Sequence, residues 1–280
     1  MLLIAAACKV KAQGNAARAY CNVLAAMRVC SHQGFGVEDP GASVLGLADA
    51  MTALVRSGVT CFDVDIVRTA DDQYLVGHPA RIARAANLQE KSAIFAVEAA
   101  SLAELRLAGA DAQRFPDLSK FAETLGALVV AAPSKQTTRE PIHCWLAALD
   151  LKGSLMHNDS AAADILALTL KAVPSWSPPL LLWRLGTAGS KASTLQQEYF
   201  KPGVALPMLV LRDRVEGLTT QQAEAAAIAS VDAARAPALL GASVKLHGIV
   251  EDAIKQSGLP CLAWVVNDGP ALARATRLHA

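Results

Sequence analysis

Short apolar segments alternate with alanine-rich segments along most of the chain. The apolar segments, rich in β-branched residues, are Met27–Ser31, Thr60–Val67, Tyr74–His78, Cys144–Leu151, Leu180–Leu185, Met208–Leu211, Ser243–Leu246 and Cys261–Val266. The segments with helical character between them include Val44–Ser57, Ala161–Val173 and Thr220–Ala234. Strands that are apolar on both faces and separated by amphipathic helices are typical of a parallel sheet covered by helices. The pattern therefore predicts an α/β fold.

Signals at the ends of these segments agree with that fold. Thr220 can cap a helix that begins at Gln221, and Gly58 follows the helix that precedes the strand Thr60–Val67. The loops that contain proline and glycine have neither the length nor the composition shift of an interdomain linker. These loops are Ala132–Pro141, Pro174–Pro179 and Gly186–Pro207. We therefore expect one domain over residues 27–280, preceded by an N-terminal segment over residues 1–26.

The composition fits a globular protein with a sizeable core. The chain has 280 residues, of which 53% are hydrophobic, enough for one large α/β barrel or two small domains. Its 26 lysines and arginines are balanced by 25 aspartates and glutamates. Bulk electrostatics therefore do not attract the chain to nucleic acid or to an anionic membrane, and we expect no nucleic-acid partner.

The beginning of the chain has an apolar stretch without the features of a secretory signal. No basic region precedes Leu2–Ala7, and the stretch is shorter than the ~7–15 residues of a signal core. No other segment approaches the ~18 uninterrupted apolar residues of a membrane span. The sequence therefore predicts no signal peptide and no transmembrane segment, which favours the cytoplasm. Secretion, or lipid anchoring at Cys8, is the alternative.

The cysteines show no spacing typical of a zinc site or a redox motif. The six are Cys8, Cys21, Cys30, Cys61, Cys144 and Cys261, with no Cys-x-x-Cys pair among them. The last four lie in apolar runs, where a free thiol behaves as a small buried hydrophobe. We predict free buried thiols, and a disulfide framework is the alternative.

Two aspartates in one apolar strand are the first candidates for chemistry. Asp63 and Asp65 lie two residues apart in Thr60–Val67, so both point to the same side of the sheet. Two carboxylates on one face of so apolar a strand are costly to bury without a cation. They would form half of an oxygen-ligand site for Mg²⁺ or Ca²⁺ at the end of a barrel strand. In the alternative, one aspartate caps the following loop and the other pairs with Arg68.

Two histidines end short apolar strands. His32 follows Met27–Ser31, and His78 ends Tyr74–His78. Two histidines that flank a phosphodiester could act as general base and general acid. Taken singly, either histidine is compatible with a structural role.

Four segments in order carry a resemblance to a known family. They are Ser31-His-Gln-Gly34, Pro40-Gly-Ala-Ser43, Asp63-Val-Asp65 and Leu75-Val-Gly-His78. This series resembles the glycerophosphodiester phosphodiesterases, which carry His-Arg-Gly, Pro-Glu-Asn-Thr, Glu-Leu-Asp and a strand that ends in Val-Phe-His-Asp. Both the spacing and the order are similar to the family.

Later segments continue the resemblance as far as Asp268. Ser101–Leu105 and Phe115–Leu118 are similar to the family's Thr-Leu-x-Glu-Leu helix start and Pro-Thr-Leu turn. Leu149–Lys152 resembles its Glu-Ile-Lys strand, and Gly258–Asp268 resembles its Trp-Thr-Val-Asn strand. The resemblance implies a TIM-type (β/α) barrel.

The same resemblance implies a role for each matching residue. His32 and His78 would be the catalytic acid and base. Asp63, Asp65 and Asp150 would bind a divalent cation, Mg²⁺ or Ca²⁺. Substrate-binding residues would be Lys152, which would neutralise a phosphate oxygen, Trp264, which would line the pocket wall, and Gln33, which stands beside His32.

The chain departs from the family at several of these positions. Gln33 replaces an arginine suited to phosphate, and Gly41 replaces a glutamate of the site. Asp63 and Asp150 each replace a glutamate, which withdraws each carboxylate by about 1.3–1.5 Å, more than the ~0.5 Å tolerance of a preorganised site. Pro79 stands in place of the aspartate that usually follows the second histidine.

The family's last strand has no counterpart after Leu272–Leu278. A barrel that lacks its eighth strand would have an open edge between its first and seventh strands. Either another segment replaces that strand, with Leu2–Ala7 as the candidate, or the sequence is truncated.

These observations predict metal-dependent hydrolysis of a glycerophosphodiester to glycerol 3-phosphate and an alcohol. The substrate would be a small-molecule phosphodiester. The alternative from another class is a catalytically impaired homologue that acts as a binding or regulatory module, as the changes at Gln33 and Gly41 indicate. A lyase that forms a cyclic phosphate would use the same two histidines.

Overall fold

The chain forms two compact units that interleave along the sequence in a computed structural model. The first comprises Met1–Cys30, Pro141–Leu146 and Ser177–Ala280, and the second comprises Ser31–Glu140 and Ala147–Trp176. The residues described within them are 2–3, 29–31, 47–56, 59, 61–88, 93–108, 117–131, 146–172, 180–184, 205–211, 219–233, 239–243, 248–257, 261–264 and 269–277. The division into residues 1–26 and 27–280 stays a prediction.

The second unit is built on strand β3, Cys61–Arg68. Every residue of β3 except Arg68 is buried, as expected for a strand that is covered on both faces. The hairpin partner β4, Tyr74–Val76, pairs antiparallel with β3, and β5, Leu146–Leu151, is its hydrogen-bonded neighbour. The alternation of side chains along β3 places Asp63 and Asp65 on one face and Phe62, Val64 and Ile66 on the other.

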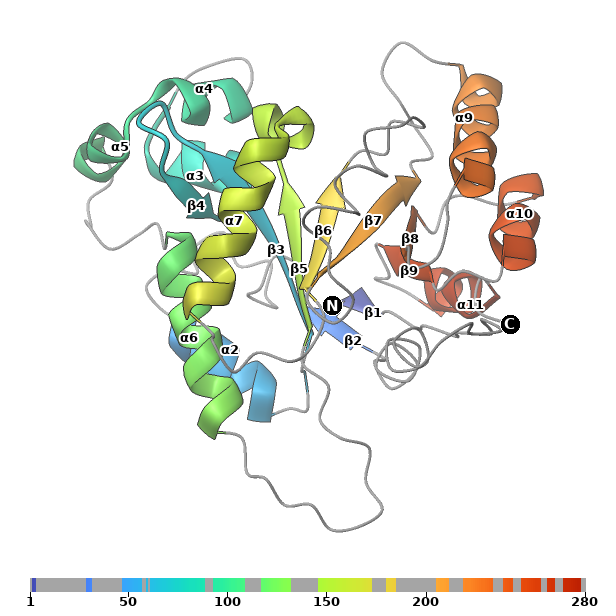
Figure 1. Cartoon of the computed structure of the whole chain (residues 1–280), viewed down its shortest axis with the longest axis horizontal. Helices are drawn as coiled ribbons and strands as arrows, with labels where there is room; N and C mark the ends of the chain where they lie inside the picture. The colour runs from blue at the N-terminus through green and yellow to red at the C-terminus, as the bar shows by residue number, and fades with distance from the viewer. Residues whose placement is uncertain are drawn as a thin grey trace. The chain divides into compact units, whose positions relative to one another are not determined.

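Helices surround these strands in the second unit (Figure 1). They are α2 Leu47–Arg56, α3 Pro79–Ala85, α4 Ala93–Ala99, α5 Leu102–Ala108, α6 Leu118–Ala131, the 3₁₀ helix η3 Gly153–His157 and α7 Asp159–Ala172. Helix α6 packs against α2 and α7, and α3 packs against α4, which contacts β3. A core cluster joins these layers, with Val67, Leu75, Ile82, Val97 and Leu105 buried at its centre.

Local chemistry explains where the hairpin and α5 begin. The turn after β3 is closed by Thr69, whose Oγ1 accepts a hydrogen bond from the Gln73 amide at 3.1 Å. The Glu104 amide donates to Ser101 Oγ at 3.2 Å, and the Ser101 amide donates to Glu104 Oε2 at 2.7 Å. This reciprocal pair is a capping box, which explains why a helix begins at the predicted Ser101–Leu105 segment.

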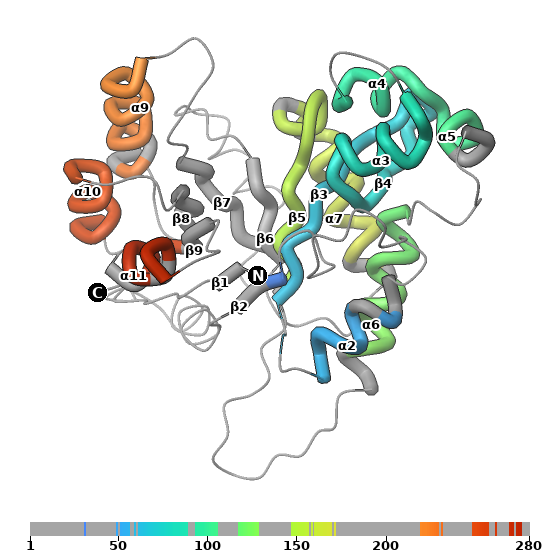
Figure 2. The backbone as a smooth tube through the Cα atoms, turned by 180° about the vertical axis from the view of Figure 1, so that it is seen from behind, coloured from blue at the N-terminus to red at the C-terminus, as the bar shows by residue number. Residues whose placement is uncertain are grey.

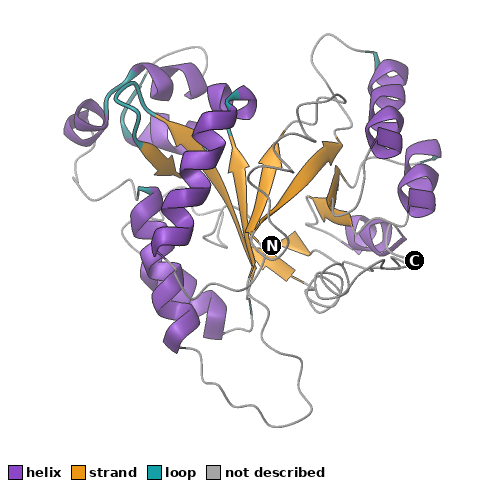
Figure 3. Ribbon diagram, in the orientation of Figure 1, coloured by secondary structure: helices purple, strands orange, loops and turns teal. Residues whose placement is uncertain are grey.

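The first unit contains four parallel strands in the order of the sequence (Figures 1 and 3). They are β6 Leu180–Arg184, β7 Ala205–Leu211, β8 Leu239–Ser243 and β9 Cys261–Trp264, and each pairs in parallel with the next. The helices are α9 Thr220–Ala233, α10 Ile249–Ser257 and α11 Gly269–Arg277. Helix α9 packs against α10, as the view from behind also shows (Figure 2). The predicted α/β class is confirmed.

Residues 2–3 form a strand beside residues 29–31, and its role as a replacement for a family strand stays a prediction. Strand β1, Leu2–Leu3, pairs antiparallel with Val29 and Cys30 of β2, Val29–Ser31, and it contacts β9. Within the first unit, β1 therefore neighbours both β2 and β9. The pairing with β1 satisfies backbone groups at the edge of β2.

Several predicted boundaries are wrong. The strand expected at Ser243–Leu246 lies earlier, at Leu239–Ser243. Strand β4 ends at Val76, because His78 begins α3 as its cap and Pro79 occupies the first turn. The cap of α9 is Thr219, one residue before the predicted Thr220, since the Gln222 amide donates to Thr219 Oγ1 at 3.3 Å.

The cysteine prediction is wrong for Cys61, which is disulfide-bonded. Disulfide formation depends on which cysteines the fold brings within bonding distance, a property that spacing along the chain does not reveal. Cys261 is a free buried thiol as predicted, and burial raises its pKa to about 12. None of the helices in the described parts of the chain is long and apolar enough to cross a membrane.

Candidate active site

Three aspartates and one lysine come together where β3 lies beside β5. Asp63 and Asp65, each 4% exposed, lie on β3. Asp150 is the second-last residue of β5, and Lys152 follows the strand directly. The side chains of Asp150 and Lys152 are 20% and 22% exposed. Adjacent strands therefore place four ionisable groups in a largely buried cluster.

Lys152 connects the carboxylates of the two strands. Its ammonium nitrogen Nζ lies 2.8 Å from Asp65 Oδ1 and also donates to Asp150 Oδ2. Burial lowers the pKa of the Lys152 ammonium, but attraction to Asp150 and Asp65 outweighs burial and raises the pKa overall. Lys152 is therefore charged and shared between two carboxylates.

Attraction to Lys152 does not cancel the effect of burial on the pKa of Asp150. Burial raises the pKa of Asp150 to about 7, and repulsion from Asp65 and Asp63 adds to the shift against the attraction of Lys152. Asp65 Oδ2 is buried without a hydrogen-bond partner within the described residues. Asp65 therefore keeps a buried oxygen that is available to bind a cation or a hydroxyl group.

The raised pKa of Asp150 predicts that stability depends on pH. Asp150 binds its proton more tightly in the folded chain than at the unfolded value of 3.8. Its contribution to stability is complete below about pH 4 and is lost as the pH rises through about 7. In metal-free buffer, we expect the free energy of unfolding in urea to fall by on the order of 2 kcal/mol between about pH 5 and about pH 8.

The variant Asp150→Asn should lose this part of the pH dependence. Asp164→Asn, at an exposed carboxylate on α7, is the matched control and should retain it. If wild type and Asp150→Asn lose the same free energy over this range, the assignment to Asp150 is wrong.

The backbone around Lys152 is held from two sides. The Lys152 amide donates to the carbonyl of Ile66 on β3 at 2.9 Å. Two residues later, the Ser154 amide donates to Glu98 Oε1 of α4 at 2.7 Å. Gly153 between them has φ +56°, and a Cβ there would lie 2.5 Å from Glu98 Oε1 and 2.7 Å from Ile94 Cγ1. Only glycine allows the chain to pass so close to α4.

Glu98 and Gly153 were missed by the sequence analysis. A glycine directly after a strand-ending lysine is a weak signal for a left-handed residue. Nothing in the sequence links Glu98 to Ser154, because the two lie on different elements.

His78 has a structural role in addition to its predicted catalytic role. Its Nδ1 accepts the Ala80 amide at 3.2 Å and caps α3. The Gly77 amide donates to the carbonyl of Asp65 at 2.9 Å, so the backbone next to His78 is hydrogen-bonded to β3. With Nδ1 as acceptor, the neutral ring carries its proton on Nε2.

The structure brings together only some of the predicted site residues. Asp63, Asp65, Asp150 and Lys152 form the cluster described above. His78 directly follows Gly77, whose amide is hydrogen-bonded to the carbonyl of Asp65. The role of His78 in proton transfer stays a prediction. His32 and Gln33 lie outside the described residues. Trp264 ends β9 in the first unit, and its predicted contact with substrate stays a prediction.

The alternative partner for the aspartates is not Arg68. The Arg68 guanidinium Nη1 lies 3.2 Å from Asp72 Oδ1 in the hairpin turn. Arg68 also lies on the opposite face of β3 from Asp63 and Asp65. The ion pair of Asp65 is with Lys152 instead.

The predicted divalent cation does not fit the described side chains as they are arranged. The donor types are right, because carboxylate oxygens suit Mg²⁺ and Ca²⁺, and Asp65 Oδ2 lacks a partner within the described residues. However, those residues contain no group of three histidine, cysteine, aspartate or glutamate side chains placed to ligate one ion. Lys152 engages oxygens of Asp65 and Asp150. We therefore derive no catalytic step through a cation.

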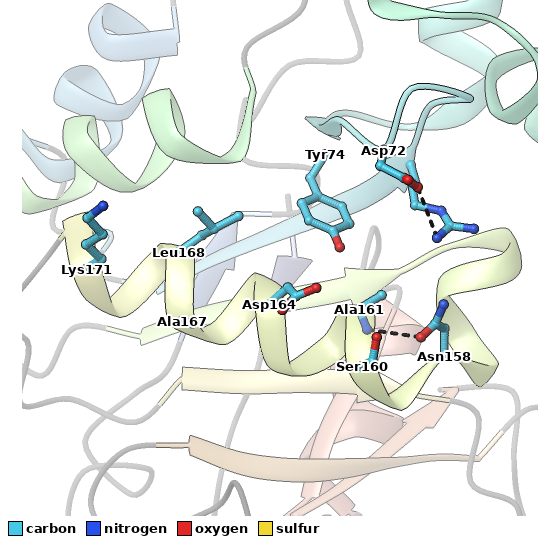
Figure 4. A pocket seen from close by; sticks show the side chains of 10 residues that line it. Asp72, Tyr74, Asn158, Ser160, Ala161, Asp164, Ala167, Leu168 and Lys171 are labelled. Atoms are coloured by element: carbon cyan, nitrogen blue, oxygen red, sulfur yellow. Dashed lines mark hydrogen bonds and ion pairs between the residues drawn. The ribbon is translucent and has the colours of Figure 1, made fainter.

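A separate hollow of about 550 Å³ lies between the hairpin and α7 (Figure 4). Its lining has mixed charge and comprises Arg68, Asp72, Tyr74, Asn158, Ser160, Ala161, Asp164, Ala167, Leu168 and Lys171. Burial raises the pKa of Tyr74, which lies over α7. No member of the lysine and aspartate cluster lines this hollow, so it is distinct from the candidate site.

Solved structures of phosphodiesterases are similar to this chain. No protein-family model and no curated protein sequence matches it. A Silicibacter pomeroyi protein assigned as a glycerophosphoryl diester phosphodiesterase is 18% identical, with 89% of this chain and 86% of that chain covered at a TM-score of 0.57. The glycerophosphodiester phosphodiesterase of Thermotoga maritima is 12% identical, with 89% and 90% covered at a TM-score of 0.54.

A third similar structure contains a reaction product. The phosphodiesterase of Oleispira antarctica, in complex with sn-glycerol-3-phosphate, is 15% identical, with 89% of this chain and 88% of that chain covered at a TM-score of 0.52. At these identities the likeness shows the fold. The predicted resemblance to glycerophosphodiester phosphodiesterases is therefore confirmed for the fold, which is similar to a TIM barrel.

Proposed function

We propose that this chain hydrolyses a small phosphodiester, with a glycerophosphodiester as substrate and glycerol 3-phosphate and an alcohol as products. The observation that carries the proposal is the cluster of Asp63, Asp65, Asp150 and Lys152 between β3 and β5. Ionisable groups are costly to bury, and a fold shared with phosphodiesterases supports a chemical role for them. The Oleispira antarctica complex supports the choice of substrate.

Lys152 is the group suited to the phosphate. Displacement at phosphorus gathers negative charge on the phosphoryl oxygens, and a fixed ammonium stabilises that charge. Asp65 and Asp150 hold the Lys152 ammonium in place. The predicted contacts of Gln33 and Trp264 with the substrate complete this proposal.

His32 and His78 carry out the two proton transfers of the proposed reaction. One histidine takes a proton from the attacking water as its oxygen bonds to phosphorus, and the other gives a proton to the alkoxide as its bond to phosphorus breaks. His78 can act as a base through Nε2 only after its proton moves to Nδ1. That change breaks the cap with Ala80, at a cost of about 1 kcal/mol.

The two roles of His78 can be separated by substitution. Asparagine is a good helix cap but does not titrate near neutral pH. We therefore expect His78→Asn to lower kcat on glycerophosphocholine by about 100-fold or more, with the free energy of unfolding within about 0.5 kcal/mol of wild type. His78→Ala should lose both activity and about 1 kcal/mol of stability. Turnover is followed by ³¹P NMR, and unfolding by urea titration.

The assay distinguishes the proposed function from its alternatives. If His78→Asn retains wild-type kcat, His78 has no part in proton transfer. A cyclic phosphate in the ³¹P spectrum would identify the lyase. The absence of turnover with several glycerophosphodiesters, with and without added Mg²⁺ or Ca²⁺, would favour the binding module. The engagement of Asp65 and Asp150 by Lys152 is the observation in favour of that module.

A further inference from the structure

We infer that the Lys152 ammonium is the resident cation of this site, in the position between Asp65 and Asp150 where a divalent ion that bridges the two carboxylates would bind. The inference rests on the proposed function, because it concerns the source of positive charge at the same site. It departs from the cation predicted from the sequence. Lys152 would be both the ion-pair partner of the carboxylates and the group that binds the phosphate of the substrate.

The contacts of Lys152 leave no room for a second cation on the same oxygens. Its Nζ lies 2.8 Å from Asp65 Oδ1 and is bonded to Asp150 Oδ2. Mg²⁺ or Ca²⁺ would lie roughly 2.0–2.6 Å from each of these oxygens. An ion at that distance from both would overlap the ammonium, so binding of the ion requires Lys152 to leave.

Departure of Lys152 is opposed by the structure around it. The backbone of residues 152–154 is fixed by hydrogen bonds to Ile66 and Glu98 and by the close contact of Gly153 with α4. If the side chain alone turned away, the 4% exposed Asp65 would lose its ion pair. A buried charge that loses its partner is strongly destabilising.

The carboxylates also suit an ammonium better than a divalent ion. A lysine ammonium has three donors and needs only a few oxygens around it, whereas Mg²⁺ requires near-octahedral coordination by six. In the described part of the chain, no three ligating side chains are placed so that they could hold one metal ion. Asp63 and Asp150 are each one methylene shorter than the glutamates of the family that the sequence resembles. Short carboxylates leave the central space to the long lysine side chain.

The test is Mn²⁺ binding, measured by electron paramagnetic resonance on the whole protein without substrate. We expect wild type to bind Mn²⁺ at this site no more tightly than about 1 mM, and Lys152→Met to bind one ion at least about tenfold more tightly. Added Mg²⁺ should raise the Tm of Lys152→Met by about 2–4 °C and leave that of wild type unchanged.

Lys120→Met is the matched control. Lys120 is an exposed lysine of α6. Its Nζ lies 3.7 Å from Glu123 Oε2, so it also pairs with a carboxylate. This variant should bind Mn²⁺ as wild type does. An equal gain in Lys120→Met would mean that any loss of positive charge improves metal binding, which would overturn the inference.

Two other outcomes would overturn the inference. One is tight binding of a single Mn²⁺ ion to wild type that Asp65→Asn abolishes, and the other is a folded Lys152→Met that gains no affinity. If Lys152→Met does not fold, the wild-type titration decides alone, because tight binding refutes the inference and its absence supports it. None of these readouts needs turnover, so they stay valid if the chain hydrolyses no phosphodiester.

Discussion

Lys152→Met should lower the free energy of unfolding by about 3–5 kcal/mol in metal-free buffer. The substitution removes the ammonium from Asp65, which is 4% exposed, and from Asp150, while methionine keeps most of the side-chain volume. The lost pairing leaves Asp65 and Asp150 without the counter-ion that they share. Urea unfolding at neutral pH, with chelator present, measures the change.

The same variant should have almost no phosphodiesterase activity, because the ammonium is also the proposed contact for the phosphate. Lys120→Met should change stability by less than about 0.5 kcal/mol, since its pair with Glu123 is exposed. The double variant Lys152→Met/Asp65→Asn should recover part of the lost stability, because it removes one of the repelling charges. A loss of less than about 1 kcal/mol for Lys152→Met would show that the cluster does not depend on the lysine.

Gly153→Ala should lower the free energy of unfolding by about 3 kcal/mol. An L-residue at φ +56° costs about 1–2 kcal/mol by itself. The added Cβ would also lie 2.5 Å from Glu98 Oε1, whose hydrogen bond to the Ser154 amide would have to break or lengthen. Because Gly153 follows Lys152, we also expect the displaced ammonium to reduce kcat by about tenfold or more.

Gly248→Ala separates the cost of the backbone conformation from the cost of the steric contact. Gly248 has φ +61°, but its Cβ would meet no atom within 4 Å. This variant should therefore show only the cost of the backbone conformation, about 1–2 kcal/mol. Equal losses at the two glycines would mean that the contact with Glu98 and Ile94 contributes nothing. In that case, adding Glu98→Ala to the Gly153→Ala variant should restore none of the lost stability.

Some features of the site follow from residues close together in the sequence. The two-residue alternation of a strand places Asp63 and Asp65 on one face of β3, wherever the strand lies in the fold. The Ser101 and Glu104 pair begins α5 through bonds made within one helical turn. The apolar runs at β6 to β9 are typical of a parallel sheet, and each of these strands pairs in parallel with the next. Such patterns are local, so the sequence alone was sufficient to predict them.

Tertiary structure decided which groups meet. Lys152 was expected to contact phosphate, yet its ammonium is bound by Asp65, a residue of another strand. Glu98 and Ser154 lie 56 positions apart and meet only because α4 packs beside β3 and η3. His78 was expected to end a strand, but the following Pro79 begins a helix for which His78 is the cap.

The sequence by itself therefore determined the α/β class, the pair of aspartates on β3 and the resemblance to the phosphodiesterases. Only the tertiary structure decided that Lys152 lies between two carboxylates and that Gly153 must remain a glycine. The physical reason is that strand and cap patterns are set by neighbours within a few residues. Charge neutralisation and steric fit instead depend on groups that only the packing of separate elements brings within a few ångströms.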